Sequence, residues 1–183
     1  YIISNILLSL WIVIVAYNYP FYNWDVIPYV ASALSYEIND INKLHQITYE
    51  TIKDSVPETI YIHLTHGKYI NHMFDNSSDF FSQLRFYEIK PLYILLMYNI
   101  NKIGISLVNS TIIISTASVI FTNIIIYSWL NRYISIYIAF ILTIFISIES
   151  RLADLSRLST PDALSALIIL ISLYFLIEKK YFK

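Results

Sequence analysis

The chain has 183 residues, of which 57% are hydrophobic and 14% are charged, against roughly 25% charged residues in a typical soluble domain. Two glycines and no cysteine exclude a collagen, a disulfide scaffold, a cysteine-based metal centre and a glycine-rich nucleotide loop. A formal net charge of −1 gives no general attraction for nucleic acid, so no nucleic-acid partner is expected. The composition predicts an integral membrane protein whose main partner is the lipid bilayer.

The uncharged stretches of the sequence approach the length of membrane helices, which need about 20 mainly apolar residues. Four such stretches are Ile2–Tyr17, Ser106–Leu130, Tyr133–Ile148 and Ala163–Ile177. A fifth, Pro91–Ile105, is interrupted by polar residues and is predicted as a short span or as a helix lying at the interface. We therefore predict an all-α membrane protein with four to five transmembrane helices. Because the chain opens without Met inside an apolar run, we expect it to be the N-terminal part of a longer protein.

The predicted organisation has four parts. Residues 1–17 form the first transmembrane helix, 18–90 an extracytoplasmic loop, 91–105 the short or interfacial helix, and 106–183 a transmembrane bundle. The basic tail Glu178–Lys183 is expected in the cytosol by the positive-inside rule. If residues 91–105 do not cross, which we favour, loop 18–90 and segment Glu149–Asp162 share the outer face; otherwise they lie on opposite sides. A bacterial inner membrane is the expected location, with the endoplasmic reticulum as the alternative.

The loop 18–90 is predicted to be partly helical. It holds nine of the thirteen acidic residues, five of the twelve basic ones and all four histidines. Apolar residues follow a helical spacing over Ile27–Ile41, and Ile47–Ile52 is expected to be a further helix. Thr59–Leu64 is expected to be a short extended piece, and Asp75–Asp79 a turn. The histidines match no recognised zinc-ligand spacing.

Asp25 is the first candidate functional residue, because it follows the first span within an aromatic-rich segment. A carboxylate at the membrane boundary can accept a proton from an acceptor hydroxyl or bind a divalent cation such as Mg²⁺ or Mn²⁺. The structural alternative is a helix N-cap, with Pro28 in the first turn.

Two further groups of charged residues lie next to apolar stretches. Arg85, Glu88 and Lys90 precede Pro91, and two cations at the interface suit a phosphate or pyrophosphate headgroup; ordinary interfacial snorkelling is the alternative.

The second group lies between the third and fourth apolar stretches and includes Arg151, Arg157 and Asp162. Its end has a helix-start pattern, with Ser159 or Thr160 as the cap, Pro161 at the first position and Asp162 in the first turn. That pattern leaves the two arginines and two aspartates of the segment unexplained, and charges near a membrane are costly and often functional.

The order of these features resembles polytopic GT-C glycosyltransferases, such as protein O-mannosyltransferases and the aminoarabinose transferase of lipid A. Asp25–Ala31 is similar to their first-loop Asp-x-x-x-Tyr-x-x-Ala, and Tyr87–Tyr93 to their Lys-Pro-Pro-Leu-Tyr element, with Leu92 in place of the second proline. Ser159–Leu164 is similar to the Asp-containing start of a later helix.

The resemblance implies an inverting transfer of a sugar from a polyprenyl-phosphate donor at the outer membrane face. Asp25 would be the base or the metal-associated carboxylate, Lys90 and Arg85 would bind the lipid phosphate, and Asp162 would support the pocket. Glu88 is separated from Lys90 by one residue, unlike in the family, so no role is transferred to it. A transporter or flippase fragment and a non-catalytic membrane assembly subunit are the alternatives; transporters place polar or broken helices near the bilayer midplane, whereas the charges here lie at helix ends.

Overall fold

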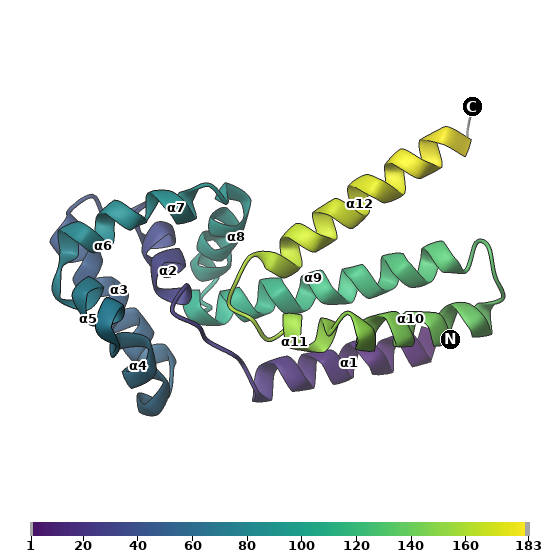
Figure 1. Cartoon of the computed structure of the whole chain (residues 1–183), viewed down its shortest axis with the longest axis horizontal. Helices are drawn as coiled ribbons and strands as arrows, with labels where there is room; N and C mark the ends of the chain where they lie inside the picture. Colours follow the sequence, from purple (N-terminus) through teal and green to yellow (C-terminus); the bar gives the residue numbers. More distant parts are fainter. Residues whose placement is uncertain (1, 182–183) are drawn as a thin grey trace. The chain divides into compact units, whose positions relative to one another are not determined.

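The computed structural model describes residues 2–181 of the chain, and side chains from residue 6 to residue 177. Its architecture is all-α, as predicted (Figure 1). The chain divides into two compact units, Tyr1–Pro20 with Ile114–Lys183, and Phe21–Ile113. We call the first the apolar bundle and the second the loop unit, and describe each by itself.

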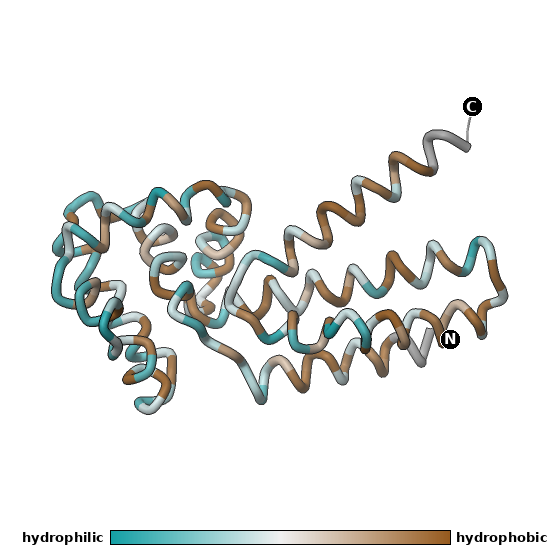
Figure 2. The backbone as a smooth tube through the Cα atoms, viewed as in Figure 1, coloured by the Kyte–Doolittle hydropathy of each residue, from teal (hydrophilic) through white to brown (hydrophobic). Residues whose placement is uncertain are grey.

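The apolar bundle contains the helices at all four predicted apolar stretches. These are α1 (Ile2–Asn18), α9 (Leu107–Leu130, which begins in the loop unit), α10 (Ile136–Glu149) and α12 (Asp162–Tyr181), with the short α11 (Leu152–Leu155) before α12. Apolar residues predominate along the long helices (Figure 2). Their common core is formed by Ile12, Val119, Leu152 and Ala163. The basic tail lies outside the residues with described side chains.

Within the described residues, only α9 is both long and apolar enough to cross a membrane. The described apolar parts of α1, α10 and α12 are shorter, at Ile6–Asn18, Ile136–Glu149 and Asp162–Ile177. The helical class of the fold is therefore confirmed, whereas four to five membrane crossings remain a prediction.

Hydroxyl groups on α9 hold the segment between α11 and α12 in place. Ser115 Oγ donates to the carbonyl oxygen of Leu158 at 2.7 Å, and Thr116 Oγ1 to that of Ser156 at 3.2 Å. Both hydroxyl-bearing residues are buried. They supply hydrogen-bond donors to backbone carbonyls that helix geometry leaves unpaired, and such groups are costly to bury without partners.

The loop unit is built around α2 (Val26–Leu34), eight of whose nine residues are buried. It packs against two longer helices, α3 (Ile41–Ser55) and α8 (Pro91–Lys102). A helix that is apolar on all sides belongs in the interior, so α2 is the core of this unit. The remaining helices are α4 (Glu58–Thr65), α5 (Lys68–Asp75), α6 (Ser77–Gln83) and α7 (Arg85–Glu88).

The structure corrects three details of the predicted loop. The helix expected over Ile27–Ile41 ends at Leu34, and Asp40 starts α3 by accepting a hydrogen bond from the Lys43 amide at 2.7 Å. Thr59–Leu64 is helical and not extended, because the carbonyl of Pro57 accepts from the amides that begin α4. The turn expected over Asp75–Asp79 shrinks to one residue between α5 and α6.

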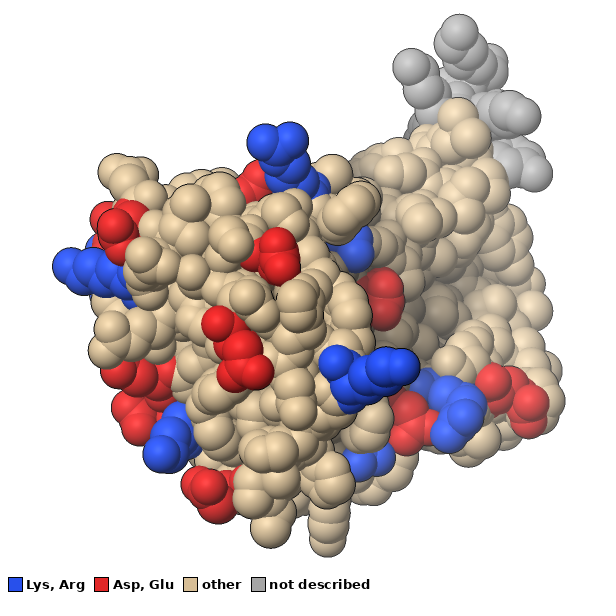
Figure 3. Space-filling view, turned by 60° about the vertical axis from the view of Figure 1, so that its left-hand side comes forward, with Lys and Arg blue, Asp and Glu red and all other residues tan. Residues whose placement is uncertain are grey.

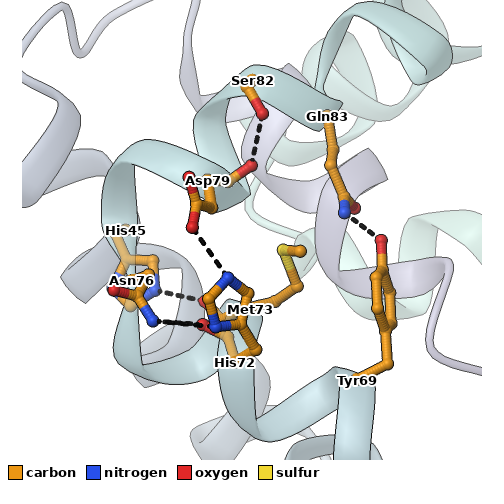
Figure 4. A network of polar contacts seen from close by, with 8 residues as sticks. All are labelled: His45, Tyr69, His72, Met73, Asn76, Asp79, Ser82 and Gln83. Carbon is orange, nitrogen blue, oxygen red and sulfur yellow. Dashed lines mark hydrogen bonds and ion pairs between the residues drawn. The ribbon is translucent and has the colours of Figure 1, made fainter.

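Two of the four histidines in the loop unit, His45 and His72, make polar contacts between helices (Figure 4). His72 Nε2 contacts Asp79 Oδ2 at 2.7 Å across the α5–α6 junction, and Asn76 Nδ2 donates to the carbonyl oxygen of His72 at 2.9 Å. His45 on α3 contacts the Met73 carbonyl oxygen at 3.0 Å. These contacts join α3, α5 and α6.

A second polar contact joins the ends of α2 and α8. Lys102 pairs with Glu37, which also accepts a hydrogen bond from Tyr98 Oη at 2.8 Å. Acidic and basic side chains are interspersed on the face shown in Figure 3, with no extended area of one sign. That mixed surface offers no preferred attraction for a polyanion.

Candidate functional site

Asp25 lies at the turn that begins α2. The turn is closed by hydrogen bonds from the Val26 amide to the Asn23 carbonyl at 3.1 Å and from the Ile27 amide to the Trp24 carbonyl at 3.1 Å. Asp25 occupies the N-cap position, but its side chain makes no capping hydrogen bond. The N-cap position given as the structural alternative for Asp25 is therefore confirmed, whereas its carboxylate oxygens bond to other partners.

Two side chains donate to the half-buried Asp25 carboxylate. Tyr87 Oη donates to Oδ1 at 2.9 Å, and Asn23 Nδ2 donates to Oδ2 at 2.9 Å. Hydrogen bonds to a carboxylate orient it and stabilise its charged form. The local chain and a distant helix thus fix the carboxylate together.

Lys90 reaches the same part of the loop unit from the start of α8. Its Nζ donates to Tyr29 Oη at 2.7 Å and lies 5.4 Å from the centroid of that ring. Tyr29 is on α2, one turn after Asp25, and is only 2% exposed. Pro91 begins α8, and Lys90 is the N-cap residue directly before it. The missing amide of proline is tolerated at the first position of a helix.

Two tyrosines in edge-to-face contact connect the Asp25 carboxylate to the Lys90 ammonium. The rings of Tyr29 and Tyr87 pack edge to face, with centroids 5.0 Å apart and planes at 86°, an arrangement that aromatic pairs prefer. Within the described residues no ion pair joins Asp25 to Lys90; each is bound to one of the two tyrosines. We call these four residues the Asp25–Lys90 site.

Burial raises the pKa of Tyr87 above its ordinary value, and the hydrogen bond to Asp25 raises it further. The neutral phenol therefore persists to more alkaline pH than an exposed tyrosine. Tyr87 is a hydrogen-bond donor to the carboxylate throughout the neutral range, and not a base.

The sequence motif that contains Lys90 also contains Arg85 and Glu88, which lie on α7. Both side chains are exposed. Among the described residues no polar contact ties either of them to Asp25 or Lys90. The structure thus brings Asp25 and Lys90 together and leaves the predicted phosphate-binding role of Arg85 a prediction.

A second polar cluster lies in the apolar bundle, before α12. Asp154 pairs with Arg151 Nε at 2.8 Å and with Arg157 Nη1 at 3.4 Å. Arg157 Nε also donates to the carbonyl oxygen of Tyr19. The cluster ends at α12, where Thr160 Oγ1 donates to Asp162 Oδ2 at 2.7 Å.

The helix predicted after Thr160 is present, but α12 begins at Asp162, one residue later than the predicted first position, Pro161. Asp154, which pairs with both arginines, belongs to the predicted charged segment but was given no site role, although its spacing of three from each arginine was the available signal. The cluster and the Asp25–Lys90 site belong to different units, so the prediction that they serve one pocket stays a prediction.

The described residues contain no group of three His, Cys, Asp or Glu side chains that could hold a metal ion. Asp25 offers one carboxylate, and a magnesium ion in proteins is commonly bound by one or two carboxylates together with substrate phosphates. A divalent cation here would therefore depend on a phosphate-containing substrate for its remaining ligands.

Comparisons of the chain with family models, characterised proteins and solved structures found no match. The resemblance to GT-C glycosyltransferases therefore depends on the quoted sequence motifs alone.

Proposed function

We propose that the chain is the N-terminal part of an integral-membrane glycosyltransferase that moves a sugar from a polyprenyl-phosphate donor to an acceptor at the outer face of the membrane. The observation that carries the proposal is the Asp25–Lys90 site. Two motifs from opposite ends of the loop supply opposite charges to one site, and among the described residues no ion pair joins these two charges.

Each charge suits one half of the transfer. The acceptor hydroxyl attacks the anomeric carbon of the sugar, and its proton passes to the Asp25 carboxylate, which acts as the general base. The bond between the anomeric carbon and the phosphate oxygen breaks as the new glycosidic bond forms. Lys90 stabilises the negative charge that develops on the departing lipid phosphate. Arg85 would add a second cation from α7, and Mg²⁺ or Mn²⁺, if used, would bind between Asp25 and the phosphate.

The aromatic surroundings support a lipid-linked donor. Tyr87 also packs against Trp24, with ring centroids 6.4 Å apart, and Trp24 packs against Tyr69 at 5.7 Å. Tyr and Trp are enriched where protein meets the membrane interface. An aromatic cluster around a carboxylate fits a substrate whose lipid remains in the bilayer while its sugar is in water.

The test uses the full-length protein in its native membrane, with Asp25→Asn and Lys90→Ala made separately. Asp54→Asn and Lys68→Ala are matched controls, since both residues are exposed in the same unit. Cell-envelope glycans are compared by mass spectrometry at equal protein levels. We expect loss of one sugar and accumulation of its polyprenyl-phosphate form in the two site variants only. An unchanged glycan profile with normal membrane insertion would move Asp25 and Lys90 to structural roles and favour a transporter or an assembly subunit.

A further inference from the structure

The loop unit exposes large apolar side chains from α7 into the first half of α8. Phe86 and Ile89 are each 73% exposed, and Leu92 and Leu95 on α8 are 48% and 47% exposed. They stand at every third position of the sequence, so successive members are neighbours on a helical stretch. We call these four residues the α7–α8 face. Apolar side chains exposed singly are common, but a group of them indicates a contact surface.

Other apolar residues of the same stretch already fill the interior of the loop unit. Leu84, Tyr93, Ile94 and Met97 are at most 2% exposed, and α8 packs against α2. The α7–α8 face is therefore additional to the core of the unit. Its residues have no packing reason within the unit to be Phe, Ile or Leu.

The outward side of α3 shows what the same unit presents to water. The apolar residues Leu44 and Ile52 of this helix are buried. Beyond Ile41 its exposed residues are all polar or charged: Asn42, Lys43, Gln46, Glu50, Lys53 and Asp54. That division is typical of a helix between a core and water, so the surroundings of α3 and of the α7–α8 face differ.

The outward side of α8 changes from apolar to polar along the helix. After Leu92 and Leu95, its next exposed residues are Asn99 and Lys102. The apolar surroundings of α8 therefore end near the middle of the helix. A helix at the boundary between lipid and water has such a change in its exposed residues.

The direction of α9 identifies this boundary as a membrane surface. Within the described residues α9 is the helix that is long and apolar enough to cross a bilayer, and its first residues, up to Ile113, belong to the loop unit. α8 precedes it by the short connection Ile103–Ser106 and runs across its direction (Figure 1). If α9 crosses the membrane, α8 lies along the membrane plane. With 12 residues, α8 is about 18 Å long, which is too short to cross a hydrocarbon core of roughly 30 Å.

We propose that the α7–α8 face inserts into the surface of the bilayer that α9 crosses, at the level where headgroups meet acyl chains. The charged residues beside it, Arg85 and Glu88, are exposed and of opposite sign, so insertion depends on apolar contact and not on headgroup charge. Lys90 lies within this stretch, and insertion would keep the Asp25–Lys90 site at the membrane surface. The contact rests on the membrane location in the proposed function but not on glycosyl transfer, so its test has no activity readout.

The experiment uses the full-length protein with one introduced cysteine and no other, in vesicles of phosphatidylcholine. An environment-sensitive fluorophore is attached at Phe86→Cys, Ile89→Cys or Leu92→Cys, and phosphatidylcholine with a nitroxide near the top of its acyl chain is the quencher. Each label is expected to be quenched several-fold more strongly than labels at Glu50→Cys on α3 and Asn99→Cys on α8. Equal quenching at all five positions would overturn the proposal.

A label on α9 reports membrane insertion separately. Phe121 is 56% exposed near the middle of α9, and a fluorophore at Phe121→Cys should be quenched by a nitroxide deep in the acyl chains. Quenching there without quenching at the α7–α8 face would overturn this contact and leave the proposed function standing. No quenching at either place would overturn both. Blue-shifted but unquenched labels at the face would show that protein covers it, which would also overturn the contact with lipid.

A double substitution tests whether the residues insert as one face. Phe86→Ser with Ile89→Ser should lower quenching of the Leu92→Cys label several-fold, while the unfolding temperature in detergent stays the same because both side chains are mostly exposed. Lys43→Ser with Gln46→Ser, two exposed residues of α3, is the matched control and should leave the quenching unchanged. An equal effect of the two double substitutions would overturn insertion through this face.

Discussion

Tyr87 connects the carboxylate of the Asp25–Lys90 site to its aromatic pair. Tyr87→Phe keeps the ring that packs on Tyr29 and removes the donor to Asp25. Hydrogen bonds to charged groups are worth about 1.5–3 kcal/mol, so we expect the transfer rate to fall about tenfold or more, with KM little changed. The measurement is glycosyl transfer by the purified full-length protein. Tyr61→Phe, in the same unit, is the control, and equal rates in wild type and Tyr87→Phe would show that the hydrogen bond has no catalytic role.

The buried hydroxyl of Tyr49 is expected to lower the free energy of unfolding. Tyr49 is 4% exposed on α3, and its buried hydroxyl has no hydrogen-bond partner among the residues that the structure describes. Its ring packs against Phe74, with centroids 4.8 Å apart. Tyr49→Phe retains the ring and removes the unpaired group, so we expect the free energy of unfolding to rise by about 1 kcal/mol. Chemical denaturation of the full chain measures it, and a decrease in stability would show that the hydroxyl is satisfied in solution.

The sequence allowed the charged members of the site to be predicted. Tyr29 and Tyr87 lie within the two quoted motifs, Asp25–Ala31 and Tyr87–Tyr93, but no role was predicted for either. Asp25 and Lys90 stand out because charges are scarce and lie beside apolar stretches. Tyrosine occurs 17 times, so composition does not distinguish Tyr29 or Tyr87 from the rest. The spacing of four from Asp25 to Tyr29 on a helix was the available signal; the approach of Tyr87 depends on tertiary packing.

At the scale of elements, apolar composition was sufficient to locate the four long helices, because each is bounded by charged or turn residues. Periodicity failed over Ile27–Ile41, where apolar residues continue at helical spacing across the break after Leu34. The competing signal was the cap at Asp40, whose side chain accepts from the amide three residues later. An N-cap residue within a run of apolar residues at helical spacing indicates that a second helix begins there. The cap depends on a contact between residues three apart, whereas the apolar spacing extends over many residues and does not show the break.

The Asp40 cap should be measurable in the stability of α3. Asp40→Ala removes the hydrogen bond to the Lys43 amide, and loss of an N-cap costs about 1 kcal/mol. Hydrogen exchange of the α3 amides is expected to show this decrease. Asp54→Ala, near the C-terminal end of the same helix, should change the exchange by only a few tenths of a kcal/mol. Equal effects of the two substitutions would contradict a capping role for Asp40.

The contact between α2 and α8 should depend on pH. The hydrogen bond from Lys102, and then that from Tyr98, lowers the pKa of Glu37 below its ordinary value of 4.5. A lowered pKa in the folded state means that the contact contributes stability above pH 4.5 and loses it as the pH falls through the folded value. Carbon-13 NMR should show Glu37 titrating below 4.5. Lys102→Gln should move that midpoint upward without moving that of Glu50, and an unmoved Glu37 midpoint would contradict the contact.

At the scale of the whole molecule, each unit has its own reason to fold. The loop unit buries eight of the nine residues of α2. In the apolar bundle, large apolar side chains such as Ile14, Ile141 and Phe145 are more than half exposed. Exposed apolar surface of that extent is unfavourable in water and suits a bilayer or further helices. The loop unit also exposes Phe86 and Ile89, so a membrane bundle with a water-facing loop stays a prediction.

The predicted crossing pattern can be tested directly, because the chain has no cysteine and single cysteines can be introduced without background. If α9, α10 and α12 each cross the membrane and residues 91–105 do not, a cysteine that replaces Lys68 or Ser150 lies on the outer face. A cysteine that replaces Asn131 then lies on the inner face. We expect an impermeant maleimide to label Lys68→Cys and Ser150→Cys in intact cells, and Asn131→Cys only after permeabilisation. Labelling of both Asn131→Cys and Ser150→Cys in intact cells would place both ends of α10 on one side, so α10 would not cross the membrane. Labelling of Lys68→Cys with protection of Ser150→Cys would instead mean that residues 91–105 cross the membrane, and the loop unit and the Arg151–Asp162 cluster would then face opposite sides.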